Sequence, residues 1–319
     1  MAEVGCAGIL VVDTFCGPMK DLPHQGQLLA VDDMPAHSGG CAANVAIDLA
    51  KQSVLVDVAG CVGDDPSANL LTEALTKSRV GCEHIVRAPN CPTSKTVILL
   101  VEGQDRRYIH SFGANAAFTV DHIRRDWVAG LRVFYLGGLF LMPSFRTAEF
   151  LGLLKFCREK GVVTVVDVVI PQHVRGMADL APLLPYIDYF LPNNDEAHAL
   201  TGCERPADQL SVLLAAGAGA AIVTLGRDGA LAARKGECWR SGVYPMPIVD
   251  PSGAGDAFVA GVITGILRGW DLPQMLRFAS ALGASAVRAI GTTQGVFSAS
   301  EAEAFLAANH LEAKQARLI

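Results

Sequence analysis

The chain has 319 residues, 51% of them hydrophobic, so it can bury a sizeable core in one large α/β domain or in two modest ones. Its formal net charge of −6, without a long basic run, argues against nucleic acid as the main partner. Nine cysteines with no Cys-x-x-Cys pair disfavour a disulfide framework or a structural zinc site, and they indicate a reducing cytosol.

No targeting or membrane segment is visible in the sequence. The first residues, Met1–Val4, lack the basic region that opens a secretory signal. The longest apolar runs without charge, Val133–Pro143 and Ala257–Leu267, are too short to span a bilayer. We therefore expect a soluble, cytoplasmic protein that has no membrane partner.

The first apolar run, Gly8–Val12, predicts a buried strand that ends at Asp13. Open α/β sheets bind ligands at the carboxyl ends of their parallel strands, so Asp13 is a candidate ligand-binding residue. The structural alternative is a turn residue at the strand end. A nucleophilic aspartate of the dehalogenase kind usually needs a second Asp two positions on, where Phe15 stands.

Next comes a stretch broken by glycine and proline, Thr14–His37, in which Gln27–Asp32 is predicted as a strand of a small sheet. Gly39 and Gly40 then precede a predicted helix, and two glycines allow the backbone to approach a ligand closely. Asn44 lies inside that helix, where asparagine is unfavourable unless its amide has a task.

A strand at Val54–Val62 and a helix at Pro66–Ser78 follow. Lys95–Val101 and Arg106–Ser111 are then predicted as two strands of a hairpin. Together with the strand near residue 30, this hairpin predicts a small β-sheet lid built from segments of about 14–37 and 93–113.

From residue 131 onward, strands and helices alternate, which predicts a parallel sheet covered on both faces. The predicted strands are Val133–Leu136, Val162–Val166, Ile187–Leu191, Ala220–Thr224 and Val243–Val249. The predicted helices are Ser144–Lys160, Asp195–Leu200, Ala207–Ala216, Ala257–Leu267, Pro273–Ala289 and Ala299–Ala308. The tail after His310 is polar and is expected to fray. We predict a single α/β domain over residues 1–319, with a central, mostly parallel sheet plus the lid.

Two turns in this half follow predicted strands. Asn193 and Glu196 have the spacing of a helix N-cap with a Glu at its third position, and on this pattern alone a capping interaction is the better interpretation. Thr224-Leu225-Gly226 opens a glycine turn, for which a simple hairpin is again the better interpretation of the pattern alone.

The stretch Asp250-Pro251-Ser252-Gly253-Ala254-Gly255-Asp256 stands directly before a strongly apolar helix. The first amides of such a helix have no internal partner, and with the helix dipole they form an anion site. A carboxylate beside that site repels phosphate, but it suits a base that deprotonates a hydroxyl attacking phosphate. Alternatively, Asp256 is only a first-turn acid favoured by the dipole.

This stretch resembles the second signature of the PfkB/ribokinase-like carbohydrate kinases, Asp-Thr-x-Gly-Ala-Gly-Asp, with Pro251 in place of the usual Thr. Ser38 to Ala46 is similar to the first signature, with Cys41 where ribokinases proper commonly have Lys. The Asn193…Glu196 and Thr224…Gly226 turns match further family patterns in the same order. The resemblance covers nearly the whole chain and implies a ribokinase-like fold and an ATP-dependent sugar kinase.

The resemblance also implies roles for particular residues. In catalysis, Asp256 is the general base, and the amides of Gly253, Ala254 and Gly255 stabilise the phosphoryl charge. The acceptor is held by Asp13, Gly39, Gly40 and Asn44. ATP and Mg²⁺ are bound by Asn193, Glu196, Thr224, Gly226 and Ser280. A monovalent cation, K⁺, is held near Asp250, Ser252, Gly291 and Gly295.

Two other functions stay open. A nucleoside is the alternative acceptor because Tyr135–Phe140 is similar to a stretch of adenosine kinases, and Phe15, Phe112 or Phe140 would then line a base pocket. A non-catalytic sugar-binding relative is less favoured because Asp256 and its glycine-rich turn are intact. No P-loop or protein-kinase motif occurs. Dimerisation through the lid is a further expectation, because exposed sheet edges pair.

Overall fold

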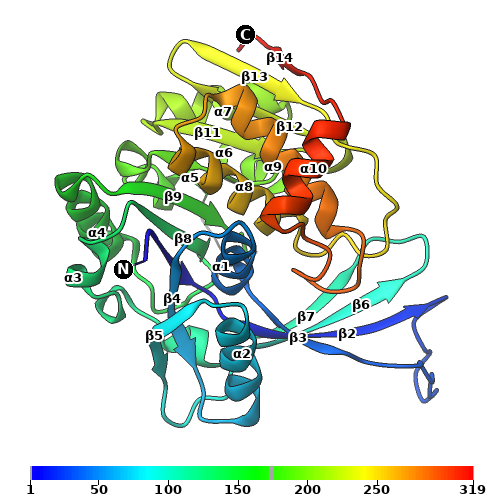
Figure 1. Ribbon diagram of the computed structural model, residues 1–319. Helices are drawn as coiled ribbons and strands as arrows, with labels where there is room; N and C mark the ends of the chain where they lie inside the picture. Colours follow the sequence, from blue (N-terminus) through cyan, green and yellow to red (C-terminus); the bar gives the residue numbers. More distant parts are fainter. Residues whose placement is uncertain (1, 172–175, 319) are drawn as a thin grey trace.

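The computed structural model of the protein describes residues 2–171 and 176–318. A large sheet runs through the molecule in the strand order β14-β13-β12-β11-β10-β9-β8-β1-β4-β5 (Figure 1). Neighbouring strands from β5 to β11 are parallel, and those from β11 to β14 are antiparallel. The strands are β1 (Val4–Gly8), β4 (Val56–Val62), β5 (Gly81–Arg87), β8 (Val133–Leu139), β9 (Val163–Val168), β10 (Tyr189–Phe190), β11 (Ala220–Thr224), β12 (Ala230–Arg234), β13 (Glu237–Ser241) and β14 (Ala313–Gln315).

Helices cover both faces of this sheet, as the alternation of strands and helices predicts. The helices are α1 (Cys41–Lys51), α2 (Pro66–Lys77), α3 (Arg125–Val128), α4 (Thr147–Lys160), α5 (Met177–Leu180), α6 (Asn194–Thr201), α7 (Pro206–Ala215), α8 (Ala254–Arg268), α9 (Leu272–Ala286) and α10 (Ala299–Ala308). One apolar core joins the sheet to α4, α6 and α7, and a second joins it to α1, α2, α8 and α9. The central strands, such as β1, β4, β8, β9 and β11, are buried on both sides because they contribute side chains to both cores. In the part of the chain that the structure describes, no helix is long and apolar enough to cross a bilayer.

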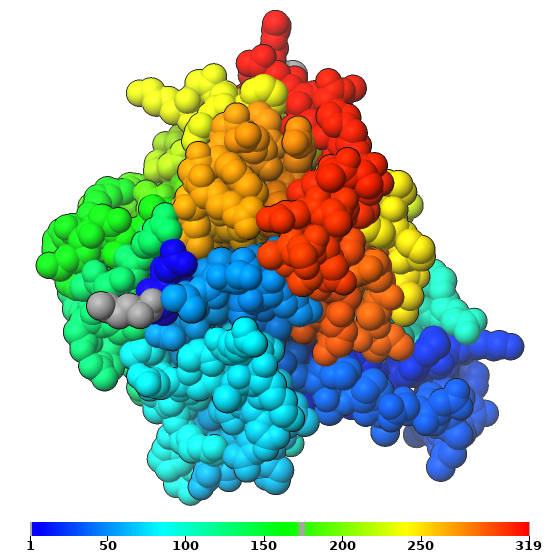
Figure 2. Space-filling model, viewed as in Figure 1, coloured from blue at the N-terminus to red at the C-terminus, as the bar shows by residue number. Residues whose placement is uncertain are grey.

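A second, smaller sheet projects beside the body of the molecule at the lower right of Figure 1. Its order is β3-β2-β6-β7, and its strands are β2 (Val11–Met19), β3 (Ala36–Gly39), β6 (Lys95–Val101) and β7 (Arg107–Ser111). The predicted hairpin is present as the antiparallel pair β6 and β7. Figure 2 shows α1 (blue) on one face of the body, between α2 (cyan) below it and α9 and α10 (orange to red) above it.

The predicted first strand is wrong in its bounds, and this changes the place of Asp13. β1 ends at Gly8, whose φ of 139° lies in the region that favours glycine, and the chain then leaves the large sheet. β2 starts at Val11 in the small sheet. Asp13 therefore lies inside a strand of the small sheet and not at the end of a central parallel strand.

Three other predicted segments differ from the structure. Gln27–Asp32 forms no strand, and Ala36–Gly39 takes the place beside β2. Val243–Val249 forms no strand either, because its two prolines, Pro245 and Pro247, cannot donate backbone hydrogen bonds. The tail does not fray throughout: β14 pairs with β13 and covers what would otherwise be an open sheet edge.

Candidate active site

The glycine-rich turn forms the N-terminus of α8, as predicted. Gly253 is the N-cap residue with φ 76° and ψ −3°, and a Cβ there would overlap the backbone carbonyl of Thr292. Asp250 holds the turn from behind. Its Oδ1 accepts hydrogen bonds from the amide of Ser252 (3.0 Å) and its hydroxyl (2.7 Å). Its Oδ2 accepts one from the amide of Gly291 (3.1 Å). The first amides of α8 are thereby fixed at a helix N-terminus, where an anion is favoured.

Asp256 stands in the first turn of α8 and points toward α1. Asn44 Nδ2 donates a hydrogen bond to Asp256 Oδ2 at 2.8 Å, and Thr292 Oγ1 donates one to Asn44 Oδ1 at 2.8 Å. Burial raises the pKa of Asp256, while hydrogen bonds from Asn44 and Cys41 oppose the rise. The buried amide of Asn44 thus joins α1, α8 and the loop before α10. The task of the Asn44 amide is therefore to orient the Asp256 carboxylate. The sequence indicated only that an asparagine inside a helix needs some task.

Asp13 lies on β2, and its carboxylate packs closely against Gly39. A Cβ on Gly39 would overlap the Asp13 carboxylate. Gly40 has φ 88° and lies against the carbonyl of Ile9, so both positions of the Gly-Gly pair require glycine. Burial raises the pKa of Asp13 to about 7; a hydrogen bond from Thr96 opposes the rise, and the charges of Asp256 and Asp250 add to it. The predicted acceptor residues therefore come together.

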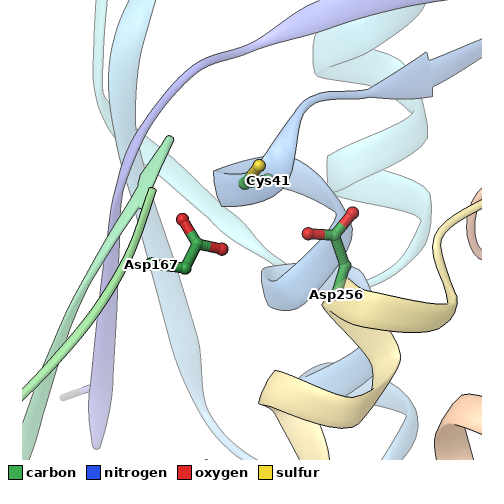
Figure 3. A group of neighbouring side chains, drawn as sticks. All are labelled: Cys41, Asp167 and Asp256. Atoms are coloured by element: carbon green, nitrogen blue, oxygen red, sulfur yellow. The ribbon is translucent and has the colours of Figure 1, made fainter. Parts of the chain in front are cut away.

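Asp167 and Cys41 complete this acidic cluster (Figure 3). One oxygen of Asp167, one of Asp256 and the Cys41 sulfur all lie within 4.8 Å of one another. Burial, together with the charge of Asp256, raises the pKa of Asp167 well above the usual carboxyl range. Asp167 accepts hydrogen bonds from the Tyr135 hydroxyl and the Gly138 amide. Sequence reasoning missed Asp167, although an acid at the end of an apolar, β-branched run was the signal used for Asp13.

A cavity of about 350 Å³ adjoins the α8 N-terminus at Ala254 and Gly255. Three of the predicted ATP residues, Thr224, Gly226 and Ser280, line it together. Much of the remaining wall is apolar and comes from α8, α9 and the segment before Asp250, including Tyr244, Met246, Ile248, Phe258, Ala284 and Val287. A pocket with apolar walls beside an anion site has the form that a flat base linked to phosphates needs.

Asn193 and Glu196 form the reciprocal capping box of α6. The amide of Asn193 donates to Glu196 Oε2 at 2.8 Å, and the amide of Glu196 donates to Asn193 Oδ1 at 2.9 Å. Asn193 forms an isolated bridge with Thr224, so this turn lies beside the cavity. Burial raises the pKa of Glu196 to about 7, opposed by the Asn193 amide and assisted by the charges of Asp256 and Asp195. Capping accounts for the sequence pattern, and Glu196 also lies close enough to Asp256 for that charge to raise its pKa.

The residues predicted to hold a monovalent cation do not all lie in one free site. Asp250, Ser252 and Gly291 are joined by the hydrogen bonds described above. The carbonyl of Gly295, in contrast, accepts a hydrogen bond from Arg288 Nη2 at 2.6 Å. A guanidinium at that oxygen repels a second cation. Gly295 therefore does not fit the predicted role, while the other three residues stay together.

Comparison with solved structures defines the class of the fold. The Thermotoga maritima ribokinase matches with a TM-score of 0.82 and 23% identity, covering 96% of this chain and all of that one. The Arabidopsis thaliana ribokinase complexed with ribose and ATP matches with a TM-score of 0.80 and 23% identity, covering 96% and 98%. A putative ribokinase II from E. coli in complex with ATP and Mg²⁺ matches with a TM-score of 0.82 and 21% identity, covering 97% and 100%. The predicted ribokinase-like α/β fold is confirmed.

The family follows from the sequence comparisons. The model of the pfkB family of carbohydrate kinases matches residues 1–298. The Shigella flexneri fructoselysine 6-kinase is 26% identical over 257 residues, which cover 79% of this chain and 90% of that protein. The Haemophilus influenzae ribokinase is 23% identical over 311 residues, which cover 96% and 97%. The chain belongs to the pfkB family of carbohydrate kinases, which are phosphotransferases acting on hydroxyl groups.

Proposed function

We propose that this enzyme transfers the γ-phosphoryl group of ATP to a hydroxyl of a small sugar, with Asp256 as the general base. The observation that carries this proposal is the position of the Asp256 carboxylate, in the first turn of α8, directly beside the amides of Gly253–Gly255. A base there reaches a hydroxyl that attacks a phosphoryl group bound by those amides. Catalysis by positioning and charge stabilisation is what phosphoryl transfer requires.

The acceptor is bound between α1 and the small sheet. Asp13 accepts hydrogen bonds from its hydroxyls, and Gly39 and Gly40 leave room for it. Asn44 orients Asp256 toward it. The small sheet, with segments of about 14–37 and 93–113, covers this site as a lid within a single domain of residues 1–319. Dimerisation through this sheet stays a proposal, supported by the exposed side chains of Tyr108 and Ile109 on its edge strand β7.

The nucleotide occupies the cavity lined by Thr224, Gly226 and Ser280, with its phosphates toward Gly255. Mg²⁺, when bound, neutralises phosphate charge, and Asn193 and Glu196 would hold it through their position beside Thr224. The carboxylate of Glu196 suits a hard cation that prefers oxygen ligands. K⁺ would bind near Asp250, Ser252 and Gly291 and would stabilise the α8 turn without contacting the acceptor.

Sugar is favoured over nucleoside mainly by the polar groups around Asp13. Of the three aromatic residues named for a base pocket, only Phe15 is buried, whereas Phe112 and Phe140 are not. Phe15 is fully buried in the small sheet, where it packs against His37, so it offers no free face for a base. Tyr135 is also fully buried and donates its hydroxyl proton to Asp167. The acidic, polar cluster of Asp13, Asp167 and Asp256 suits a polyol with several hydroxyl donors.

The experiment that tests this function is ATP consumption at pH 8 with D-ribose, D-fructose, ketose phosphates, deoxy-keto acids, fructoselysine and adenosine. We expect turnover with one sugar class and none with adenosine. Turnover with adenosine alone would establish the nucleoside alternative. ATP and sugar binding by titration, without turnover for any compound, would indicate a non-catalytic relative.

A further inference from the structure

A row of polar side chains crosses the small sheet at one level. His37 on β3 is the neighbour of Asp13 on β2, Asp13 is the neighbour of Thr96 on β6, and Thr96 is the neighbour of His110 on β7. Directly opposed residues point to the same face of a sheet. Asp13 faces the acceptor site, so Thr96 and His110 stand behind it on the same face.

Contacts through Thr96 connect three members of this row. Thr96 Oγ1 lies 3.0 Å from His110 Nδ1. Its side chain also stands directly beside Asp13 across the β2–β6 pair, and a hydrogen bond from it opposes the rise in the pKa of Asp13. A hydroxyl has a single proton to donate. When Asp13 is ionised, that proton goes to the carboxylate, so Thr96 must accept from His110. His110 then carries its proton on Nδ1.

The surroundings of His110 agree with a hydrogen bond donated from its Nδ1 to Thr96. Burial lowers the pKa of His110, which favours its neutral form. His110 Nε2 is buried and has no hydrogen-bond partner among the described residues, and the ring meets Phe112 edge-on with centroids 5.3 Å apart. The only polar contact of the His110 side chain that the described residues provide is therefore the one to Thr96. On the other flank, His37 packs against Phe15 and makes no hydrogen bond to Asp13.

We propose that Thr96 and His110 are positioning residues that hold the carboxylate of Asp13 as an acceptor for the hydroxyls of the sugar. This inference rests on the proposed role of Asp13 in acceptor binding. His110 acts only through Thr96: its Nδ1–H fixes the direction of the Thr96 hydroxyl, and that hydroxyl fixes one oxygen of Asp13. The remaining lone pairs of Asp13 face the acceptor.

A first test needs no substrate. With ¹⁵N-labelled histidine at pH 8, the nitrogen shifts of His110, assigned by comparison with His110→Phe, report which ring nitrogen carries the proton. We expect Nδ1–H in the parent protein and in Thr96→Ser. In Thr96→Val, which keeps the shape but has no hydroxyl, we expect the proton to move to Nε2. Nε2–H in the folded parent protein would overturn the proposal.

A second test is kinetic and uses whichever of D-ribose, D-fructose and fructoselysine is turned over fastest. Thr96→Val should raise the acceptor KM roughly tenfold at unchanged ATP KM, as expected for a lost hydrogen bond to a charged group. His110→Phe should raise it less. Thr96→Ser and His110→Asn, whose amide nitrogen replaces Nδ1, should stay within about twofold of the parent.

The double variant decides how the two residues are connected. In the Thr96→Val background, His110→Phe should have no further effect on the acceptor KM, because His110 has lost the group through which it acts. Additive effects, or equal increases in the acceptor KM and the ATP KM, would contradict the proposal. Asp13→Asn is the benchmark: an unchanged acceptor KM in that variant would refute the role of Asp13 itself, whatever the result for Thr96.

Discussion

At the scale of single residues, the chemistry of the site depends on carboxyl groups whose surroundings differ. Asp256 is partly desolvated but receives hydrogen bonds from Asn44 and Cys41. Asp167 is more deeply buried, and the nearby charge of Asp256 raises its pKa further. Two close carboxyl groups cannot both ionise freely, and the hydrogen bonds to Asp256 favour its ionised form over that of Asp167. This difference supports the proposed role of Asp256 as the group that accepts a proton.

We predict that Asp256→Asn lowers kcat by roughly 10²–10⁴-fold, the usual contribution of a general base, while ATP binding is retained. Burial raises the pKa of Asp256, so the acid limb of the kcat–pH profile of the parent should lie above the usual carboxyl range: turnover falls as the pH drops and the base is protonated. Steady-state kinetics and nucleotide titration measure both effects. Asp121→Asn, at an exposed acid, is the control. A kcat within about threefold of the parent would remove Asp256 from the mechanism.

At the scale of elements, the site is made by the start of α8 and its contact with the loop that follows α9. The two glycines of the turn have different surroundings. Gly253 has positive φ and lies against the carbonyl of Thr292, whereas a Cβ on Gly255 would meet no atom within 4 Å. One glycine is therefore required by packing, and the other borders the cavity at the start of α8.

We predict that Gly253→Ala destabilises the protein by about 1–3 kcal/mol or more, because strain at positive φ adds to the overlap with Thr292. Gly255→Ala is the matched control and should leave stability unchanged or raise it by about 0.5–1 kcal/mol, since alanine is favoured over glycine inside a helix. Denaturant unfolding of both variants measures this difference. Equal midpoints would show that the turn adapts and that Gly253 is not required for the fold.

At the scale of the whole molecule, the loop of residues 290–297 connects the two ends of the site. Lys51 Nζ of α1 donates to the carbonyls of Thr293 and Val296, and Gln52 Nε2 donates to that of Phe297 at 2.7 Å. The same loop holds the α8 turn through Gly291 and Asp250. Helix α1 and the α8 turn, which carry the proposed acceptor and phosphate sites, are thus both held by one segment.

A cation at this junction should act on the turn rather than on the acceptor. We predict that K⁺ raises kcat by roughly threefold or more at nearly constant acceptor KM. The measurement is the initial rate with Mg²⁺-ATP in Tris buffer, in potassium, sodium or choline chloride at matched ionic strength. Equal rates in K⁺ and choline would mean that the Lys51 and Arg288 contacts are sufficient to hold the loop.

The sequence by itself determined the architecture and pointed to the residues proposed to react. Continuous apolar runs predicted most strands of the large sheet, because a strand covered on both faces must be apolar throughout. Helical spacing of apolar residues predicted most of the helices that cover it. The glycine-rich turn before an apolar helix predicted an anion site because a helix start always presents unpaired amides. Local patterns such as the capping box at Asn193 and Glu196 were also visible, since their partners are three residues apart.

Only the tertiary structure decided how distant residues meet. No local pattern shows that the chain leaves the large sheet after Gly8, so Asp13 was assigned to the wrong sheet. Asp167 and Cys41 reach Asp256 from different elements, and Thr96 and His110 reach Asp13 through strand pairing. The pKa of each of these acids depends on burial and on charges far away in sequence. Sequence patterns predict local hydrogen bonds and the spacing of apolar residues, whereas desolvation and cross-strand contacts exist only once the chain has folded.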